Sequence, residues 1–142
     1  MAQPTTIRDC MHKHPLTIHP EASLVQAVDT ILESRLTGLT VTDDEGCVVG
    51  ILSELDCLSA TLAAVYNDGD PAYTTVGDAM TPVIESCMPG DSIVEVAQAM
   101  LDSRQRRRPV IEEGKLVGQV SSSNVLWALI EHSRQKVRAQ GR

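Results

Sequence analysis

An internal duplication constrains the fold of this chain more than any other feature of its sequence. Met80 repeats Met11 at a distance of 69 residues, and Gly118 repeats Gly50 at a distance of 68 residues, after a one-residue deletion in a turn. Twelve identities with this single gap fall on turns, helix starts and strand ends. Such a pattern indicates that one structural unit occurs twice.

Each repeat predicts the order strand–helix–strand–strand–helix. In the first repeat, a short strand over 16–18 precedes a helix that Ser23 caps, and strands over 39–42 and 47–52 follow. A second helix begins after Ser53. The apolar helix positions that we expect to be buried are Leu24, Ala27, Val28, Ile31, Leu32, Leu55, Leu58 and Leu62 in the first repeat, and Ile93, Val96, Ala97, Met100 and Leu101 in the second.

A repeat of about 60 residues has only a marginal core of its own. We therefore predict an α/β fold of the α+β type, in which two repeats related by a pseudo-twofold axis pack sheet to sheet into one globular module. The predicted parts are a first repeat over 1–66, a linker over 67–75, a second repeat over 76–133 and a basic C-terminal tail over 134–142. A pseudo-twofold axis creates paired clefts between repeats, where ligands collect.

The composition argues against several classes of partner. The 142 residues include no Phe, one Trp and two Tyr, so stacking platforms for single-stranded nucleic acid are missing. A net charge of −7 disfavours duplex nucleic acid and anionic membranes. No apolar run approaches the length of a membrane span. The four cysteines form no C-x-x-C pair, which favours reduced thiols and a cytoplasmic location.

The turn from Ser53 to Asp56 is the strongest candidate for a binding site. It joins an apolar strand to a helix, and backbone N–H groups at a helix start can meet anionic or polar ligands. Asp56 stands one turn into the helix, where its carboxylate can accept hydrogen bonds from the vicinal hydroxyls of a ribose. The alternative is a capping box, in which Ser53 and Asp56 only satisfy free N–H groups.

The order of motifs resembles a tandem cystathionine-β-synthase (CBS) domain pair. Asp-x-Met lies near the start of each repeat and Gly-x-x-Ser-x-x-Asp at the end of the first, and the likeness extends from Ile7 to Ser133. The resemblance implies a non-catalytic regulatory module that binds AMP, ADP, ATP or S-adenosylmethionine as a regulatory ligand and requires no other cofactor. It also implies a homodimer formed through the C-terminal helices of the repeats, where Trp127 is a candidate anchor.

The resemblance also assigns roles to individual residues. Ser53 and Asp56 correspond to the residues that bind ribose. The adenine side would be formed by Val76, Thr81, Pro109 and Val110. The second repeat carries Ser121 and Asn124 at the ribose positions, and an uncharged amide holds a diol more weakly than a carboxylate. We therefore expect the second cleft to bind weakly or to be empty.

A basic run precedes the second strand of the second repeat. Arg106 and Arg107 are candidates to bind the ligand's phosphate, because arginine offers two parallel donors to phosphate oxygens. Residues 1–75 carry a net charge of −8 and residues 76–142 a net charge of +1, so cationic contacts must come mostly from the second half. The alternative is that the arginines complement the dipole of the preceding helix and remain solvated.

Other functions receive less support from the sequence. Nothing in it predicts catalysis, because no nucleophile–base set and no phosphate-binding glycine loop is present. A scaffold module that binds an unidentified protein partner and no nucleotide is the main alternative to a sensor. Cys10, His12 and His14, with His19 as a fourth ligand, would suit a metal-responsive module, but adjacent ligands rarely close a tetrahedral site and we predict no metal.

Overall fold

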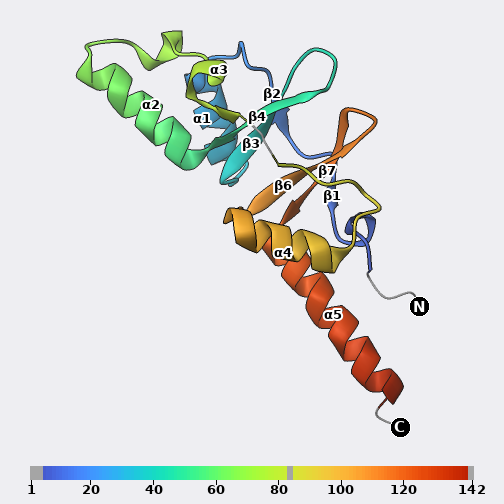
Figure 1. Cartoon of the computed structure of the whole chain (residues 1–142). Coiled ribbons are helices and arrows are strands. Elements are labelled where there is room, and N and C mark those ends of the chain that lie inside the picture. Colours follow the sequence, from blue (N-terminus) through green and yellow to red (C-terminus); the bar gives the residue numbers. More distant parts are fainter. Residues whose placement is uncertain (1–4, 83–84, 141–142) are drawn as a thin grey trace. The chain divides into compact units, whose positions relative to one another are not determined.

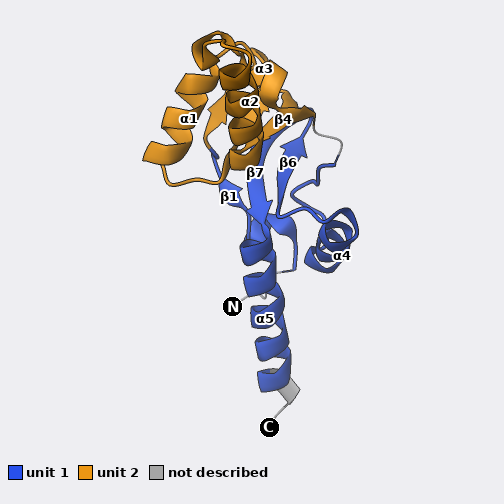
Figure 2. Ribbon diagram, turned by 90° about the vertical axis from the view of Figure 1, so that its left-hand side faces the viewer, with its two compact units in different colours: residues 1–15, 85–142 blue, residues 16–84 orange. Residues whose placement is uncertain are grey.

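The computed structural model describes residues 5–82 and 85–140, and these residues form two compact units. Unit 1 contains residues 1–15 and 85–142, and unit 2 contains residues 16–84, as coloured in Figure 2. Each unit has its own sheet and its own apolar core. The prediction of a mixed α+β fold made from two similar units is confirmed.

Unit 2 is built on a four-stranded sheet in the order β2-β3-β4-β5. Its central strands pair antiparallel, and the short outer strand β2 pairs parallel to β3. The elements are labelled in Figure 1. They are β2 (Thr17–Ile18), α1 (Leu24–Glu33), β3 (Gly38–Thr42), β4 (Val48–Ser53), α2 (Glu54–Tyr66), the 3-10 helix η2 (Pro71–Tyr73), α3 (Val76–Ala79) and β5 (Thr81–Pro82).

Unit 1 has a three-stranded sheet in the order β1-β7-β6, and its helices α4 and α5 pack against each other (Figure 1). A bridge between Cys87 and Val110 stands where β2 and β3 pair in unit 2. The elements are the 3-10 helix η1 (Ile7–Asp9), β1 (His12–Lys13), α4 (Ile93–Ser103), β6 (Arg107–Glu112), β7 (Lys115–Ser121) and α5 (Ser122–Gln140).

The spatial units are not the sequence repeats, because the repeats exchange their leading segments. The segment 5–13 opens the first repeat, yet β1 pairs with β7 of the second repeat. The segment 76–82 opens the second repeat, yet β5 pairs with β4 of the first. Each Asp-x-Met motif therefore lies in the same unit as the strand-to-helix turn of the other repeat.

The first helix of each repeat packs largely as its apolar spacing predicts. Leu24, Ala27 and Ile31 of α1 lie in the core of unit 2, and Ile93, Val96 and Met100 of α4 lie in the core of unit 1. The last residue of each predicted face is exposed: 64% of Leu32 and 74% of Leu101 are accessible to solvent. These two positions mark the edge of the face that the sheet covers.

The expected burial of the second helix of the first repeat is wrong. Leu55, Leu58 and Leu62 of α2 are 75, 63 and 52% exposed, and Cys57 is the residue of this helix that lies in the core. α2 thus turns its small and sulfur-containing face to the sheet and its leucines outward. An apolar groove of about 510 Å³ lies between α1 and α2. It is lined by Val28, Ile31, Leu32, Glu54, Leu55, Cys57, Leu58 and Thr61.

Candidate ligand site

The turn at the start of α2 holds Ser53, Asp56 and Thr81 together in unit 2. The Ser53 hydroxyl accepts a hydrogen bond from the Asp56 N–H at 3.0 Å, and the Asp56 carboxylate accepts one from the Ser53 N–H at 3.0 Å. This is the capping box considered above. The Thr81 hydroxyl, from β5, lies 3.3 Å from both carboxylate oxygens of Asp56. A carboxylate can accept about four hydrogen bonds, so Asp56 keeps acceptor capacity for a ligand hydroxyl.

A close contact between a methionine and a glycine brings Thr81 to this turn. A Cβ atom added to Gly50 of β4 would stand 2.6 Å from the Met80 sulfur and 2.9 Å from the Thr81 carbonyl oxygen. Unit 1 repeats the arrangement, since a Cβ atom on Gly118 would stand 2.8 Å from the Met11 sulfur. The glycine of one repeat therefore leaves room for the Asp-x-Met segment of the other.

The same turn exists in unit 1 with different chemistry. The Ser121 hydroxyl accepts from the Asn124 N–H at 3.1 Å, and the Asn124 side-chain oxygen accepts from the Ser121 N–H at 3.0 Å. His12 pairs with Gln119 in the register in which Thr81 pairs with Ile51. His12 and Asn124 thus replace Thr81 and Asp56, and the unit 1 turn carries no carboxylate at this position.

The candidate phosphate residues lie beside the unit 1 turn. The Arg106 carbonyl accepts a hydrogen bond from the N–H of Ser122, the first residue of α5, at 2.9 Å. Arg107 pairs with Ser121 across β6 and β7. Unit 1 therefore groups Arg106, Arg107, Ser121 and Asn124, whereas unit 2 groups Ser53, Asp56 and Thr81.

Three of the four residues expected on the adenine side are buried, and only Thr81 is exposed. Val76 and Val110 are completely buried in the cores of units 2 and 1, so only their backbone atoms can serve a ligand. Val76 begins the helix α3 rather than a strand, because the Thr75 hydroxyl caps the Asp78 N–H at 3.2 Å. Pro109 is also buried, and its carbonyl accepts from the Cys87 N–H at 3.0 Å.

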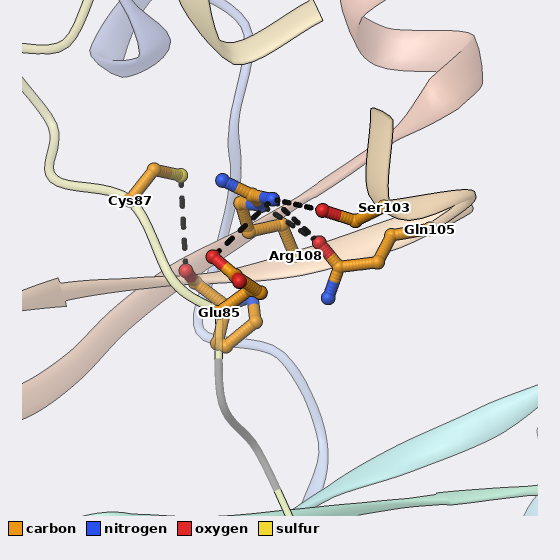
Figure 3. A network of polar contacts seen from close by, with 6 residues as sticks. Glu85, Cys87, Ser103, Gln105 and Arg108 are labelled. Carbon is orange, nitrogen blue, oxygen red and sulfur yellow. Dashed lines mark hydrogen bonds and ion pairs between the residues drawn. The ribbon is translucent and has the colours of Figure 1, made fainter. Parts of the chain in front are cut away.

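A further arginine of the basic run, Arg108, is buried, although the charged run itself is typical of a solvated surface. Arg108 is 5% exposed and lies in a network of polar side chains (Figure 3). Its Nε and one terminal nitrogen donate to the Gln105 side-chain oxygen at 2.9 and 2.6 Å. That nitrogen also lies 3.5 Å from the Ser103 hydroxyl and 3.9 Å from the Glu85 carboxylate. The duplication holds a signal for this burial, because Arg108 aligns with Leu39, a core residue of unit 2.

Charge is distributed very unequally between the units. Residues 16–84 contain 11 Asp and Glu and a single Arg, a net charge of −10, whereas unit 1 contains 11 Lys and Arg and 8 Asp and Glu, a net charge of +3. The contrast exceeds that between the sequence halves, because the segment exchange moves Arg8, Lys13 and Asp9 into unit 1 and Asp78 into unit 2. The charge of unit 1 favours anions, and the charge of unit 2 disfavours them.

The residues that the structure describes do not form a group suited to bind a metal ion. Within residues 5–82 and 85–140, no three side chains of His, Cys, Asp or Glu come together as a metal-binding group. His12 and His14 are exposed, and Cys10 is half-buried. Among the helices described for this chain, none combines the length and the apolar character that crossing a bilayer requires.

Comparison with known proteins identifies the family of this chain. The sequence model of the CBS domain matches residues 7–63 and again residues 76–131, and the chain therefore belongs to the CBS domain family. Hypoxic response protein 1 of Mycobacterium tuberculosis is 30% identical over 91% of this chain and 88% of its own length. The chloroplastic CBS domain-containing protein CBSX2 of Arabidopsis thaliana is 27% identical over 83% of this chain and 60% of its own length.

Two solved structures support the same fold. CBSX2 in complex with AMP superposes with a TM-score of 0.78 at 29% identity, over 90% of this chain and 98% of that one. Hypoxic response protein I with two coordinated zinc ions gives 0.76 at 28% identity, over 87% and 98%. The chain spans 42 to 60% of the length of the first curated relatives it matches, so the activities of those whole proteins do not transfer to it.

Proposed function

We propose that this protein is a regulatory module that binds an adenosyl ligand, with Asp56 as the residue that holds the ribose. The observation that carries the proposal is the position of the Asp56 carboxylate, which the Ser53 N–H and the Thr81 hydroxyl orient at the start of α2. The structure of CBSX2 with AMP supports adenosyl binding by a relative of this size. AMP, ADP, ATP and S-adenosylmethionine all remain candidates.

Arg106 and Arg107 are proposed as the phosphate contacts, and the positive charge of unit 1 supports this role. Asn124 has no charge to offer a ribose, so a ligand at the unit 1 turn would be held less firmly than one at Asp56. The proposed role is regulatory rather than catalytic: ligand binding shifts the population of conformations, and a partner or a dimer contact responds.

The test is a panel of AMP, ADP, ATP, S-adenosylmethionine and adenosine, measured by thermal shift and calorimetry. Binding to the folded state raises the melting temperature. Asp56→Asn is the informative variant, because Asn124 already forms the same capping box in unit 1. Loss of the charge should weaken binding about 5- to 10-fold, the difference between a charge-assisted and a neutral hydrogen bond. Unchanged affinity would place the ribose elsewhere.

Self-association is the second part of the proposal. Leu32, Leu58 and Leu62 are exposed on α1 and α2, and their counterparts Leu101, Leu126 and Ile130 are exposed on α4 and α5. Trp127, which is 55% exposed, lies on the same helix as the last two. Groups of exposed apolar side chains are typical of protein interfaces, and we propose that a second copy covers these residues.

A scaffold role is the second candidate function, and the apolar groove between α1 and α2 is the observation that favours it. If none of the ligands in the panel changed the melting temperature at millimolar concentration, the result would support this role and overturn the sensor.

A cytoplasmic location is proposed from the four free cysteines. Two relatives are chloroplastic proteins, so fractionation of cells is needed to test the compartment.

A further inference from the structure

A polar network in unit 1 stands where unit 2 has leucines. Arg108, Gln105 and Glu85 align through the duplication with Leu39, Leu36 and Leu16. Leu39 lies in the core of unit 2 and Leu36 packs against it. In unit 1 the same three positions instead hold an arginine, the amide that accepts two of its hydrogen bonds, and its carboxylate partner (Figure 3).

The polar network is not expected to make the folded state more stable than leucines at the same positions would. A guanidinium that is 5% exposed has lost most of its hydration, and its carboxylate partner lies 3.9 Å away and is half exposed. Buried ion pairs rarely stabilise a protein more than apolar residues of similar size. In unit 2 Leu39 is buried and Leu36 packs against the core, so leucines fit at two of the three positions, and Leu16 at the third is 51% exposed. The network is therefore a candidate for a role other than filling the core.

The network holds the turn that carries the candidate phosphate residues. Gln105, whose side chain Arg108 binds, donates its N–H to the Met100 carbonyl at 2.9 Å. Arg104 caps α4 in the left-handed conformation, with φ of 53°. Beyond Gln105, the Arg106 carbonyl is fixed to α5. The turn is thus tied at each end by backbone bonds and in its middle by the Arg108 side chain.

The residues of this turn differ between the two units, and the difference accompanies the presence or absence of the polar network. In unit 2 the α1 cap is Ser34, and the left-handed residue of the turn is Arg35, with φ of 53°. The Glu54 N–H donates to the Thr37 carbonyl at 2.9 Å, as the Ser122 N–H does to the Arg106 carbonyl in unit 1. The unit 2 turn carries Thr37 and Gly38 where unit 1 carries Arg106 and Arg107. The polar network and the arginines therefore occur together, in the unit of net positive charge.

We propose that Arg108 is a positioning residue for phosphate recognition: through Gln105 it holds the turn that presents Arg106 and Arg107, and so sets how strongly the protein prefers AMP to adenosine. The inference rests on the proposed function, in which these two arginines contact the phosphate. Fixing the backbone before binding removes part of the ordering cost that flexible arginines would otherwise incur. Arg108 itself makes no contact with the ligand in this proposal.

The test is the ratio of the adenosine Kd to the AMP Kd, measured by calorimetry at one ionic strength. The variant E85L/Q105L/R108L copies the leucines of unit 2 and leaves the net charge unchanged. We expect it to stay folded, to bind adenosine within twofold of wild type, and to bind AMP five- to tenfold more weakly. A role confined to stability would change the melting temperature and leave the ratio unchanged. The matched control is R8L/E112L, which removes a half-exposed ion pair of unit 1 and should keep the wild-type ratio.

If the triple variant keeps the wild-type ratio of adenosine Kd to AMP Kd, the proposal is overturned. Should the triple variant not fold, Arg108→Lys replaces it, because lysine keeps the charge but cannot make the paired bonds to Gln105; a lowered ratio supports the proposal and an unchanged ratio overturns it. Equal affinity of the wild type for AMP and adenosine overturns the inference and leaves adenosyl binding standing. Failure to bind either ligand overturns the proposed function itself.

Discussion

The Thr81 hydroxyl lies 3.3 Å from both carboxylate oxygens of Asp56, although the two residues belong to different sequence repeats. The contact exists because β5 pairs with β4, which brings the leading segment of the second repeat to the strand-to-helix turn of the first. The unit 1 turn receives His12 by the same exchange. The two turns are therefore alike in backbone and different in charge.

This difference predicts a gain of binding in Asn124→Asp. A carboxylate in the first turn of α5 should stabilise the protein by about 0.3–1 kcal/mol through the helix dipole, because the capping bonds with Ser121 are already in place. It should also add a second adenosyl site. Calorimetry with AMP should show the stoichiometry rising toward two per chain. An unchanged stoichiometry would mean that His12 and its surroundings, rather than the missing charge, exclude a ribose.

The close approach at the glycines predicts a structural defect in Gly50→Ala. The added methyl group would meet the Met80 sulfur at 2.6 Å and the Thr81 carbonyl oxygen at 2.9 Å. The sulfur can move aside, but the carbonyl belongs to the β5 backbone. We expect a loss of about 1–3 kcal/mol of stability, as for other overpacked sites, together with weaker ligand binding. Urea unfolding measures the first and calorimetry the second.

Gly118→Ala should behave like Gly50→Ala in stability, because its methyl group would meet the Met11 sulfur at 2.8 Å and the His12 carbonyl oxygen at 3.0 Å. It should leave binding at Asp56 unchanged. Gly90→Ala is the control, since nothing lies within 4 Å of its added carbon. Equal stability of all three variants would show that the leading segments are not held by these contacts.

Because leucines are exposed on α1, α2, α4 and α5, we expect self-association to depend on these helices. Leu58→Asp or Leu126→Asp should shift the protein from dimer to monomer, because a charge in an apolar interface loses its hydration without gaining a partner. Both positions are more than 60% exposed, so the fold should persist. Tyr73→Asp, at an 87% exposed position of η2, is the control. Light scattering across a concentration series gives the answer, and a wild type that is monomeric throughout would contradict the proposed dimer.

The buried thiol of Cys87 leads us to expect that the protein loses stability in alkaline solution. Burial raises the pKa of its thiol from 9.0 to about 12, while the nearby Arg108 charge opposes the shift. Between these values the unfolded chain releases a proton that the folded chain keeps, so stability falls as the pH rises above 9. The slope is about 1.4 kcal/mol per pH unit for one proton.

Cys87→Val removes this contribution with little change in packing, since Ile18 occupies the equivalent position in unit 2. Burial also raises the pKa of the Cys10 and Cys57 thiols, and both remain in the variant. Unfolding free energies from pH 7.5 to 10.5 should therefore fall in both proteins and more steeply in the wild type. Parallel profiles would show that Cys87 ionises freely in the folded state.

Features that depend on short-range patterns could be predicted from the sequence alone. The duplication, the caps of α1 and α2 and the inward face of α1 at Leu24, Ala27 and Ile31 are all visible in residue spacing. The capping box at Ser53 and Asp56 is equally local, because its bonds join residues three apart. Helical periodicity and capping need no knowledge of the rest of the chain.

Which surfaces meet could not be predicted from spacing, because it depends on contacts between distant parts of the chain. Spacing shows that Leu58 and Leu62 share a face, but whether that face is covered depends on what packs against it, and here it is exposed. The charged run around Arg108 is typical of a solvated surface. Arg108 is nevertheless buried, and its guanidinium contacts the side chains of Gln105 and Glu85. The exchange of leading segments brings Thr81 to Asp56 through strand pairing between distant residues, and no local pattern encodes a partner that the chain reaches only by folding.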